Sequence, residues 1–600
     1  MRFMLDISYI LWYINSMKTK QKGLYVADVK KQYKGKEYCS YLVRRSYREG
    51  GKVNQETISN ITHLPEDTRE LIRQSLKGKV MVPVDEAFET ISSRAHGHVL
   101  AIRKIISDLG LLKMIAPAKS RLRNIIEALL IARIINPQTK LSTNRWWHTT
   151  TIPELLEIED ADVDEIYEAM DWLLERQGKI ERALAKKHLA EGGLVLYDTS
   201  SSYYEGTKCS LAQHGYNRDK KKGKRQVVYG LMTNHEGCPV AIEVYPGNTV
   251  DSATVKEQVF ALKKRFGLNQ VVLAGDRGML TQVQIDKLKE MEGLDWVSAL
   301  RSTSIKRLLS QGEIQLSLFD ESNLMEISSP DYPQERLVVC RNPYLAEDRK
   351  RTREQLLTAT EKLLDTLAKR VASGKLVQES KIGEALGRVI NKYKMAKHFE
   401  CTIGPGLFSY QRKEQKIAEE TALDGIYVIR TSVAKEKWSK ENVVLGYKSL
   451  SRVEWGFRTL KGVDLRIRPI HHWLNGRVEA HIFICFLAYY VEWHLRQAWK
   501  TMIFEDEYPG VHEGGSPVLP ALRSDHALQK ARTQKHENGM VVHSYQTLLV
   551  ELSTIQCNAN HIPAIPEIPV FYQYTRPNEI QKKALECLGI NVNKLGGRQK

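Results

Sequence analysis

Apolar residues in the first third of the chain recur at two different periods. Residues 36–62 mix β-branched and aromatic residues with polar ones around Gly50-Gly51, which predicts a β-hairpin whose first strand carries Arg44, Arg45 and Arg48. From about 85 to 188 the apolar residues recur instead at helical spacing, as in RLRNIIEALLIARII. The pattern therefore predicts a hairpin followed by a helical region.

A mixed pattern begins at Gly193. The next 110 residues predict the order strand, strand, strand, helix, strand, helix, strand, in the segments LVLYDTSSSYY, QVVYGLMTN, PVAIEVYPGN, TVKEQVFALKKRF, QVVLAGDRG, TQVQIDKLKEME and WVSALRS. Three meander strands followed by alternating helices and strands favour a mixed sheet with right-handed crossovers, and hence an α+β plan.

Residues 303–440 interrupt this unit with the short strands LVVCRNP, FECTI and GIYVIRTS and two charged helices, roughly 346–371 and 378–397. Helical periodicity returns over 441–497, and the Gly/Pro-rich stretch 505–520 is typical of a linker. The predicted divisions are an N-terminal arm and hairpin region, a helical region, a core in two parts around an insertion, and a linker with an accessory tail: 1–84, 85–188, 189–302, 303–440, 441–500 and 501–600.

The balance of charge narrows the classes of partner. Lysine plus arginine exceed aspartate plus glutamate by 89 − 71 = 18 residues, which favours a polyanion, with nucleic acid first and an anionic membrane surface second. On this ground the hairpin either contacts DNA or forms a solvated edge, and the helical region either wraps the core or recognises DNA. The eight cysteines show no C-x-x-C pair or His/Cys cluster, so a disulfide scaffold and a zinc finger are not expected.

No apolar run reaches the roughly 18 residues of a membrane span, so we expect no membrane partner and a cytoplasmic, nucleoid-associated protein. Residues 1–16 are either part of an over-extended reading frame that really starts at Met17 or a genuine N-terminal arm, since Asp6 breaks their apolar stretch.

Three carboxylates stand out. Asp198 and Asp276 each end an apolar strand, where ligands bind in open sheets, although strand-ending aspartates are more often turn residues or caps. Tyr447, Glu454 and Lys461 are spaced seven apart, which places them on one face of a predicted helix. This face either contacts a phosphate and its metal or is a polar stripe that faces water. Carboxylates converging from two strands and a helix suit two hard cations such as Mg²⁺, with which phosphoryl transfer proceeds.

These residues lie in motifs that resemble those of bacterial insertion-sequence transposases of the DDE type, in the branch with a Y-x2-R-x3-E-x6-K third motif. The resemblance rests on DTSSSYYEG, HGYNRDKKKGKRQVVYGL, GCPVAIEVYPGNT and LAGDRGML in order, followed by the Y-x6-E-x6-K spacing, and covers roughly 190–300 and 441–490. It implies an RNase H-like catalytic core with a largely β inserted domain, and two Mg²⁺ ions, for which Mn²⁺ substitutes.

The resemblance also implies roles for single residues. Asp198, Asp276 and Glu454 are the catalytic metal ligands, and Tyr447 and Lys461 are DNA contacts. The motif's arginine is replaced by Leu450, which leaves open whether this copy is active. Arg458, about 40° round the helix from Glu454, is the candidate to replace it, whereas Arg452 points roughly the opposite way.

A basic loop follows the first core strand, with six basic side chains between Arg218 and Arg225, among them Lys221, which predicts phosphate contacts or a solvated loop. A second basic group comprises Arg466, Arg468, His471, His472 and Arg477. No G-x-S-x-G elbow supports a serine hydrolase.

The predicted protein is a DNA transposase that binds the terminal inverted repeats of its element as a homodimer, cleaves the 3′ ends and joins them to target DNA. The alternatives are a structure-specific nuclease that does not join ends, and a domesticated or decayed DNA-binding protein without cleavage.

Overall fold

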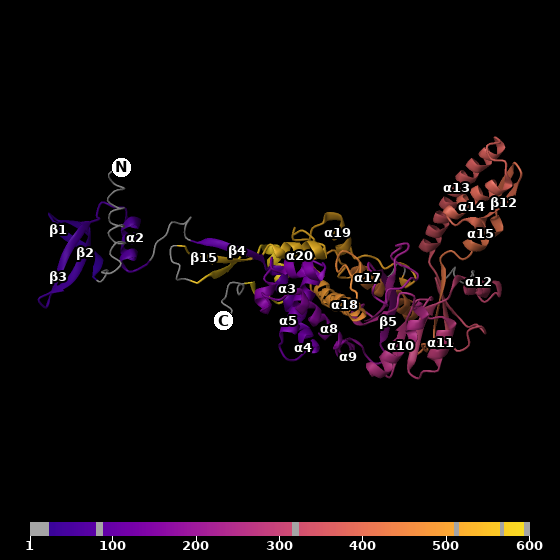
Figure 1. Cartoon of the computed structure of the whole chain (residues 1–600), viewed down its shortest axis with the longest axis horizontal. Coiled ribbons are helices and arrows are strands. Elements are labelled where there is room, and N and C mark those ends of the chain that lie inside the picture. Colours follow the sequence, from indigo (N-terminus) through magenta and orange to yellow (C-terminus); the bar gives the residue numbers. More distant parts are fainter. Residues whose placement is uncertain (1–22, 80–87, 315–322, 509–514, 564–568, 593–600) are drawn as a thin grey trace. The chain divides into compact units, whose positions relative to one another are not determined.

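The computed structural model describes residues 23–79, 88–314, 323–508, 515–563 and 569–592, so the question of residues 1–16 lies outside it. The chain divides into two compact units, the first made of Met1–Ser93 and Asn558–Gln573 and the second of Arg94–Cys557 and Tyr574–Lys600 (Figure 1). No helix in the described ranges is long and apolar enough to cross a membrane.

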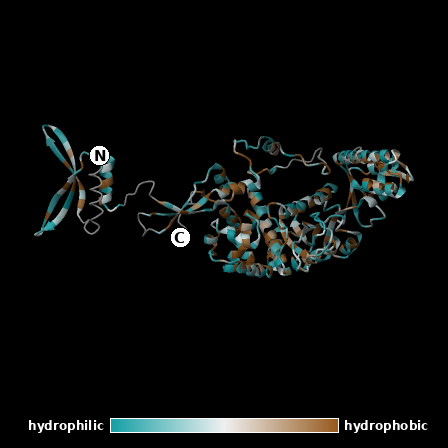
Figure 2. Ribbon diagram, turned by 45° about the horizontal axis from the view of Figure 1, so that its top comes forward, coloured by the Kyte–Doolittle hydropathy of each residue, from teal (hydrophilic) through white to brown (hydrophobic). Residues whose placement is uncertain are grey.

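The first unit is built on a three-stranded antiparallel meander of β1 (Leu24–Tyr33), β2 (Lys36–Glu49) and β3 (Lys52–Asn60). Glycines 50 and 51 form the β2–β3 turn at positive φ, as a tight hairpin requires, so the predicted hairpin is confirmed and β1 is added to it. The strands are largely hydrophilic (Figure 2), and their small core is closed by helix α2 (Glu66–Leu76). A second small sheet has the order β16-β15-β4, from Phe571–Tyr574, Gln556–His561 and Glu89–Ala95.

The second unit contains a helical layer that the sequence predicted. Its helices are α3 (Gly97–Asp108), α4 (Leu111–Ile115), α5 (Arg121–Ile135), α6 (Lys140–Trp147), α7 (Ile152–Leu156), α8 (Val163–Leu174) and α9 (Gln177–His188). Three of them, α3, α5 and α8, pack against the later helix α18 (Asn475–Ala498). Helices α5 and α18 are buried on nearly every side, which places them at the centre of the helical layer.

An eight-stranded mixed sheet has the order β10-β11-β14-β9-β8-β5-β6-β7. Along the chain, its first strands are the predicted meander of β5 (Leu194–Tyr203), β6 (Gln226–Asn234) and β7 (Pro239–Tyr245), and β8 (Val271–Ala274) and β9 (Leu294–Ala299) follow. Strand β8 is parallel to both β5 and β9. The crossovers are α10 (Asp251–Phe260), continued by a π-helical turn at Ala261–Arg265, and α11 (Gln282–Lys289). This arrangement confirms the α+β class and the strand order expected of an RNase H-like core.

The two faces of the sheet bury different helices. On β5, Val195 and Tyr197 belong to a core with residues of α10 and α11, whereas Leu196 belongs to the core that contains α18 and residues of α17 (Leu450–Lys461). The alternation follows from the two-residue period of a strand. The sheet is therefore the middle of three layers, and even-numbered positions of β5 face α17.

The prediction that the insertion is largely β is wrong, because more of its residues lie in helices than in strands. Its strands β10 (Leu324–Ile327), β11 (Arg336–Arg341) and β14 (Ile426–Thr431) extend the core sheet beyond β9 instead of forming a separate domain. The rest is mainly helical, with one hairpin: α12 (Ser302–Ser310), α13 (Pro343–Ala372), α14 (Glu379–Lys392), a short turn at Ala396–His398, β12 (Phe399–Gly404), β13 (Leu407–Arg412) and α15 (Glu414–Thr421). The helices prevail because their apolar stripes bury residues such as Leu357 and Leu364 against the hairpin.

The predicted helix that carries Tyr447, Glu454 and Lys461 is divided in two. Helix α16 (Lys440–Lys448) contains Tyr447, and α17 begins at Leu450 after Ser449. Ser449 keeps helical backbone angles, φ −61° and ψ −18°, so the break is slight. Beyond α18 the chain adds α19 (Asp525–Thr533), α20 (Tyr545–Ser553) and α21 (Glu579–Glu586).

Candidate active site

Asp198 lies on β5 at an even-numbered position, and therefore on the side of the sheet that α17 covers. Burial raises the pKa of Asp198 to about 7, while the Thr199 backbone N–H, 2.7 Å from Oδ1, and the Arg218 guanidinium act to lower it. The carboxylates of Asp276 and Asp251 raise this pKa further. Asp198 is thus a carboxyl group that the fold holds among other carboxylates without an ion pair of its own in the described ranges.

Asp276 follows β8 and is exposed. Strands β5 and β8 pair in the register Leu194 with Val272 and Leu196 with Ala274, and the same offset sets Asp276 level with Asp198. The carboxylate of Asp276 raises the pKa of Asp198, which agrees with this placement. The two strand-ending aspartates of the sequence therefore meet at one end of two adjacent parallel strands.

Glu454 reaches the same place from α17, which packs on β5, and its side chain is exposed. The environment of Tyr447 indicates that the three carboxylates lie near one another. The pKa of Tyr447 is raised to about 12, mainly by burial and in addition by Asp276, Glu454 and Asp198, while Arg277 lowers it. One tyrosine hydroxyl is therefore within electrostatic reach of all three carboxylates and stays protonated at neutral pH.

Lys461 is placed differently from the other residues of its predicted stripe. Its Nζ donates to Asp219 Oδ1 at 3.1 Å, and its side chain is 12% exposed. Arg468 binds the same oxygen, and the Tyr203 backbone N–H donates to the other at 3.0 Å. Lys461 is therefore engaged in an internal ion pair, and its DNA contact stays a prediction.

Arg218 is also turned inward. Its Nη2 donates to Asp251 Oδ1 at 2.5 Å and to Thr199 Oγ1 at 3.2 Å, and Thr199 itself donates to Asp251 at 2.6 Å. These three residues lie beside Asp198, because Thr199 directly follows it in β5. Sequence reasoning missed Asp251 and Asp219 because one resembles a first-turn helix residue and the other is a single acid in a basic loop.

The remainder of the basic loop is exposed. Lys221 lies near the Tyr203 ring, 5.7 Å from its centroid, and Arg225 donates to the Thr207 carbonyl at 3.3 Å. Lys224 pairs with Glu205 at 2.7 Å. The loop therefore presents lysines and arginines at the surface next to the end of β5.

At the motif's missing arginine the structure shows a packed side chain. Leu450 is half-buried and packs against the core of the second unit, whereas Arg458 on the same helix is exposed. Arg452 donates to the His235 carbonyl in the β6–β7 turn, which confirms that it points away from the carboxylates.

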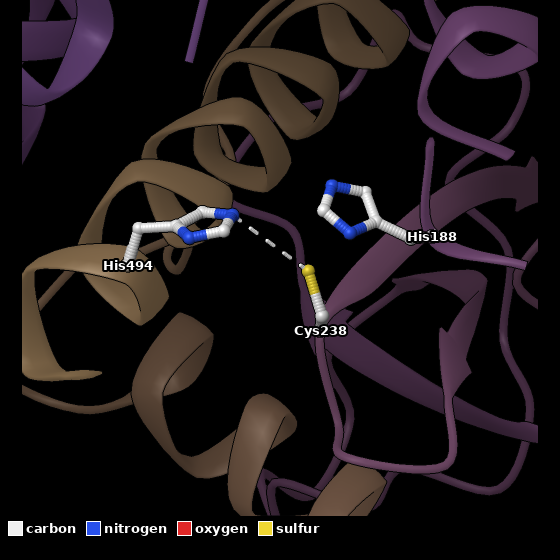
Figure 3. A group of neighbouring side chains, drawn as sticks. All are labelled: His188, Cys238 and His494. Atoms are coloured by element: carbon white, nitrogen blue, oxygen red, sulfur yellow. Dashed lines mark hydrogen bonds between the residues drawn. The ribbon is translucent and has the colours of Figure 1, made fainter. Parts of the chain in front are cut away.

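A second group with metal-ligand chemistry is assembled from distant positions (Figure 3). The ligand atoms of His188, Cys238 and His494 all lie within 4.8 Å of one another. Thiol and imidazole donors suit zinc better than magnesium. No local pattern indicates this group, because its members are far apart in the chain. His188 Nε2 is hydrogen-bonded to the Tyr490 hydroxyl at 2.9 Å, and burial lowers the pKa of both histidines to about 4, so packing alone accounts for the group.

The carboxylates fit a divalent cation on their donor chemistry. Asp198, Asp276 and Glu454 offer only oxygen, and oxygen ligands are those that hard divalent cations take. A buried carboxyl beside further carboxylates is costly when ionised, and a cation offsets this cost.

Comparisons with known proteins agree with this geometry. A family model described as the transposase DDE domain matches residues 191–491, half of the chain, and a model of the IS1634 family transposase N-terminal domain matches residues 26–81. No curated protein matches the chain.

Two solved structures show weak likeness. A piggyBac transposase synaptic complex with hairpin DNA is 10% identical, with a TM-score of 0.31, over 66% of this chain and 75% of the other. A Mos1 transposase paired-end complex is 12% identical, with a TM-score of 0.14, over 40% and 69%. Likeness at these scores does not bear on the function. The family matches do: the chain belongs to the transposase DDE domain family, and it is an insertion-sequence DNA transposase, a metal-dependent enzyme of DNA cleavage and transfer.

Proposed function

We propose that Asp198, Asp276 and Glu454 are the catalytic residues, that they hold two Mg²⁺ ions, for which Mn²⁺ substitutes, and that the enzyme cleaves the 3′ ends of its element and joins them to target DNA. The observation that carries the proposal is the common placement of the three carboxylates: the β5–β8 register sets two of them level, and α17 brings the third to the same face of the sheet.

Each residue has a distinct part in the proposal. The three carboxylates bind the cations, which when bound activate water and stabilise the leaving oxygen of an in-line displacement. Tyr447 remains a hydroxyl at neutral pH and can donate a hydrogen bond to a phosphate oxygen. Arg218, through Thr199 and Asp251, fixes the end of the strand that carries Asp198.

The DNA partner in the proposal comprises the terminal inverted repeats and the target, bound by a homodimer because two ends must be brought together. The exposed Lys221, Arg225 and Arg458 supply phosphate contacts, which give affinity without reading sequence. We propose that the domains that bind and cleave DNA are those expected from the sequence, with the helical region at 85–188 and the insertion at 303–440.

A cleavage and joining assay tests the proposal. Duplex DNA from each flank of the gene is incubated with the full chain and Mg²⁺, and the ends and joined products are mapped. Asp198→Asn and Glu454→Gln should abolish both reactions while DNA binding persists, because the carboxylates serve the reaction and not phosphate neutralisation. Glu436→Gln, at an exposed glutamate that precedes α16, is the matched control and should cut like the wild type.

The products separate the alternatives. Nicked DNA without joined products indicates a structure-specific nuclease. Binding without cleavage by the wild type indicates a decayed or domesticated copy. Cleavage by Glu454→Gln at the wild-type rate removes Glu454 from the site.

A further inference from the structure

A pocket of about 580 Å³ opens in the second unit, away from the three carboxylates. Its wall is formed by the connection between α5 and α6, by α8 through Tyr167, by residues 466–474 and by the first turns of α18. The volume is within the range of pockets that hold a small ligand.

The lining of the pocket is basic. Arg133, Lys140, Arg466, Arg468 and Arg477 contribute to it, and no aspartate or glutamate is among the described residues that line it. Five cations around one space repel each other unless an anion is present. Arg468 is paired with Asp219, and Arg477 lies 3.7 Å from Asp171, but both of these carboxylates lie outside the lining.

Lys140 is a buried lysine in the lining of this pocket. Its side chain is 3% exposed, and among the described residues its ammonium group forms no ion pair. Arg133, 5% exposed, donates only to the Gln138 carbonyl there, at 3.2 Å. Burying an unpaired ammonium group costs far more than packing its stem can return. Burial together with Arg133 accordingly lowers the pKa of Lys140 to about 7.

The rim of the pocket is aromatic. Trp473 is 62% exposed, and Lys208 lies over its ring at 4.2 Å from the centroid. The first residues of α6 and α18 also line the space, so the positive ends of two helices add to its field. An exposed tryptophan beside a cationic hollow is the combination with which proteins stack a base and hold its phosphate.

The pocket is tied to the carboxylates through β5. The end of this strand bridges to Ile470, and the Tyr204 hydroxyl donates to the His472 carbonyl at 3.2 Å. Tyr204 is six residues beyond Asp198, which at ~3.3 Å per residue is roughly 20 Å along the strand. A nucleic-acid strand several nucleotides long spans this distance.

We propose that this pocket binds a phosphate group of an unpaired nucleotide, with the adjacent base stacked on Trp473, in a subsite separate from the three carboxylates. A base has to be unpaired and unstacked before it can lie on the tryptophan, which costs free energy in a duplex, so a single-stranded nucleotide is the favoured occupant. The identity of the phosphate source rests on the proposed function, because a free phosphate has the same chemistry.

Binding of twelve-nucleotide oligothymidylate to the full chain in EDTA tests the inference, since the carboxylate site then holds no metal. Lys140→Met should weaken binding about tenfold or more, the value of one charged hydrogen bond, and reduce the slope of log K against log salt by ~0.7. The melting temperature of the unliganded variant should stay equal or rise, because an unpaired buried charge is gone. Lys381→Met, at an exposed lysine of α14, is the matched control and should bind normally.

Two further arms identify the ligand. Trp473→Ala should weaken oligothymidylate binding and leave any stabilisation by inorganic phosphate unchanged. If inorganic phosphate stabilises the wild type but not Lys140→Met, while oligothymidylate binds both equally, the pocket holds a free phosphate and the nucleic-acid assignment is overturned. If Lys140→Met unfolds, Arg466→Gln at the exposed rim replaces it, with the same expected loss of binding.

Cleavage by the wild type, measured in parallel, separates this inference from the proposed function. Normal oligothymidylate binding by folded Lys140→Met alongside Mg²⁺-dependent cleavage by the wild type overturns the pocket alone. Weakened binding by Lys140→Met alongside an inactive wild type supports the pocket and overturns the proposed reaction.

Discussion

Lys461 and Asp219 form a largely buried ion pair at 3.1 Å, between the helix that carries Glu454 and the basic loop after β5. The carboxylate side chain is 1% exposed and that of the lysine 12%. A residue that the family resemblance implies to be a DNA contact thus holds two parts of the site together.

Lys461→Met should therefore destabilise the fold. Removing one partner of a buried pair costs ~3–5 kcal/mol, and because Arg468 still binds Asp219 we expect about 1–3 kcal/mol. Urea denaturation measures this loss. The double variant Lys461→Met with Asp219→Asn should regain much of it, because the unpaired carboxylate is gone. Unchanged stability, together with a smaller slope of log K for DNA binding against log salt, would instead indicate that Lys461 contacts a DNA phosphate.

Asp198→Asn should stabilise the metal-free protein at pH 8. The pKa of Asp198 is raised from 3.8 to about 7, so the ionised carboxylate costs stability that appears as pH rises above 4 and is complete above about 7. The asparagine removes a cost on the order of 1–3 kcal/mol at pH 8 and nothing below about pH 4. Thermal melts across this range measure the difference, and equal melting temperatures at pH 8 would contradict the burial of this charge.

Arg218→Met should shift the acid limb of the cleavage pH profile upward. The guanidinium lowers the pKa of Asp198, so without it more of the carboxyl group is protonated at neutral pH. A shift of about one unit from a pKa of about 7 reduces cleavage roughly fivefold at pH 7 and hardly at all at pH 9. Lys287→Met, at an exposed lysine of α11 outside the basic loop, is the control. A uniform loss at every pH would indicate that Arg218 acts only on DNA binding.

Leu450 and Arg458 test how this chain works without the motif's arginine. If Arg458 supplies the phosphate contact, Arg458→Ala should reduce cleavage by ~10²-fold or more, the scale of one preorganised donor. Leu450→Arg should lower the melting temperature, because Leu450 packs against the core. A folded Leu450→Arg variant that restores cleavage to Arg458→Ala would show that both side chains reach one phosphate, and wild-type cleavage by Arg458→Ala would remove it from the reaction.

The sequence sufficed where one local period governs an element. The strands around Asp198 and Asp276, the crossovers between them and the helix of Glu454 all follow from runs whose period is two or 3.6 residues. The parallel direction of β8 beside β5 agrees with a helical crossover between them, whereas their residue register is a property of the folded sheet.

What the sequence could not supply depends on contacts between distant residues. Nothing local to Lys140 indicates that it faces Arg466 and Arg468 across a pocket, or that Asp219 takes Lys461 from the solvent. Strands β10, β11 and β14 were recognisable in part as short apolar runs, but their pairing with β9 is a property of the folded sheet, which is why the insertion was assigned too much independent β structure.

We propose that one cation site joins Asp198, Asp276 and Glu454, and locating a bound metal tests this proposal most directly. Iron(II) bound in place of the native cation, with ascorbate and peroxide, generates hydroxyl radicals that cut the polypeptide close to the metal, and mass spectrometry of the fragments locates it. We expect cuts near residues 198, 276 and 454 that excess Mg²⁺ suppresses and that Asp198→Asn abolishes. Cuts confined to the neighbourhood of His188, Cys238 and His494, or cuts near the three carboxylates that persist in Asp198→Asn, would contradict it.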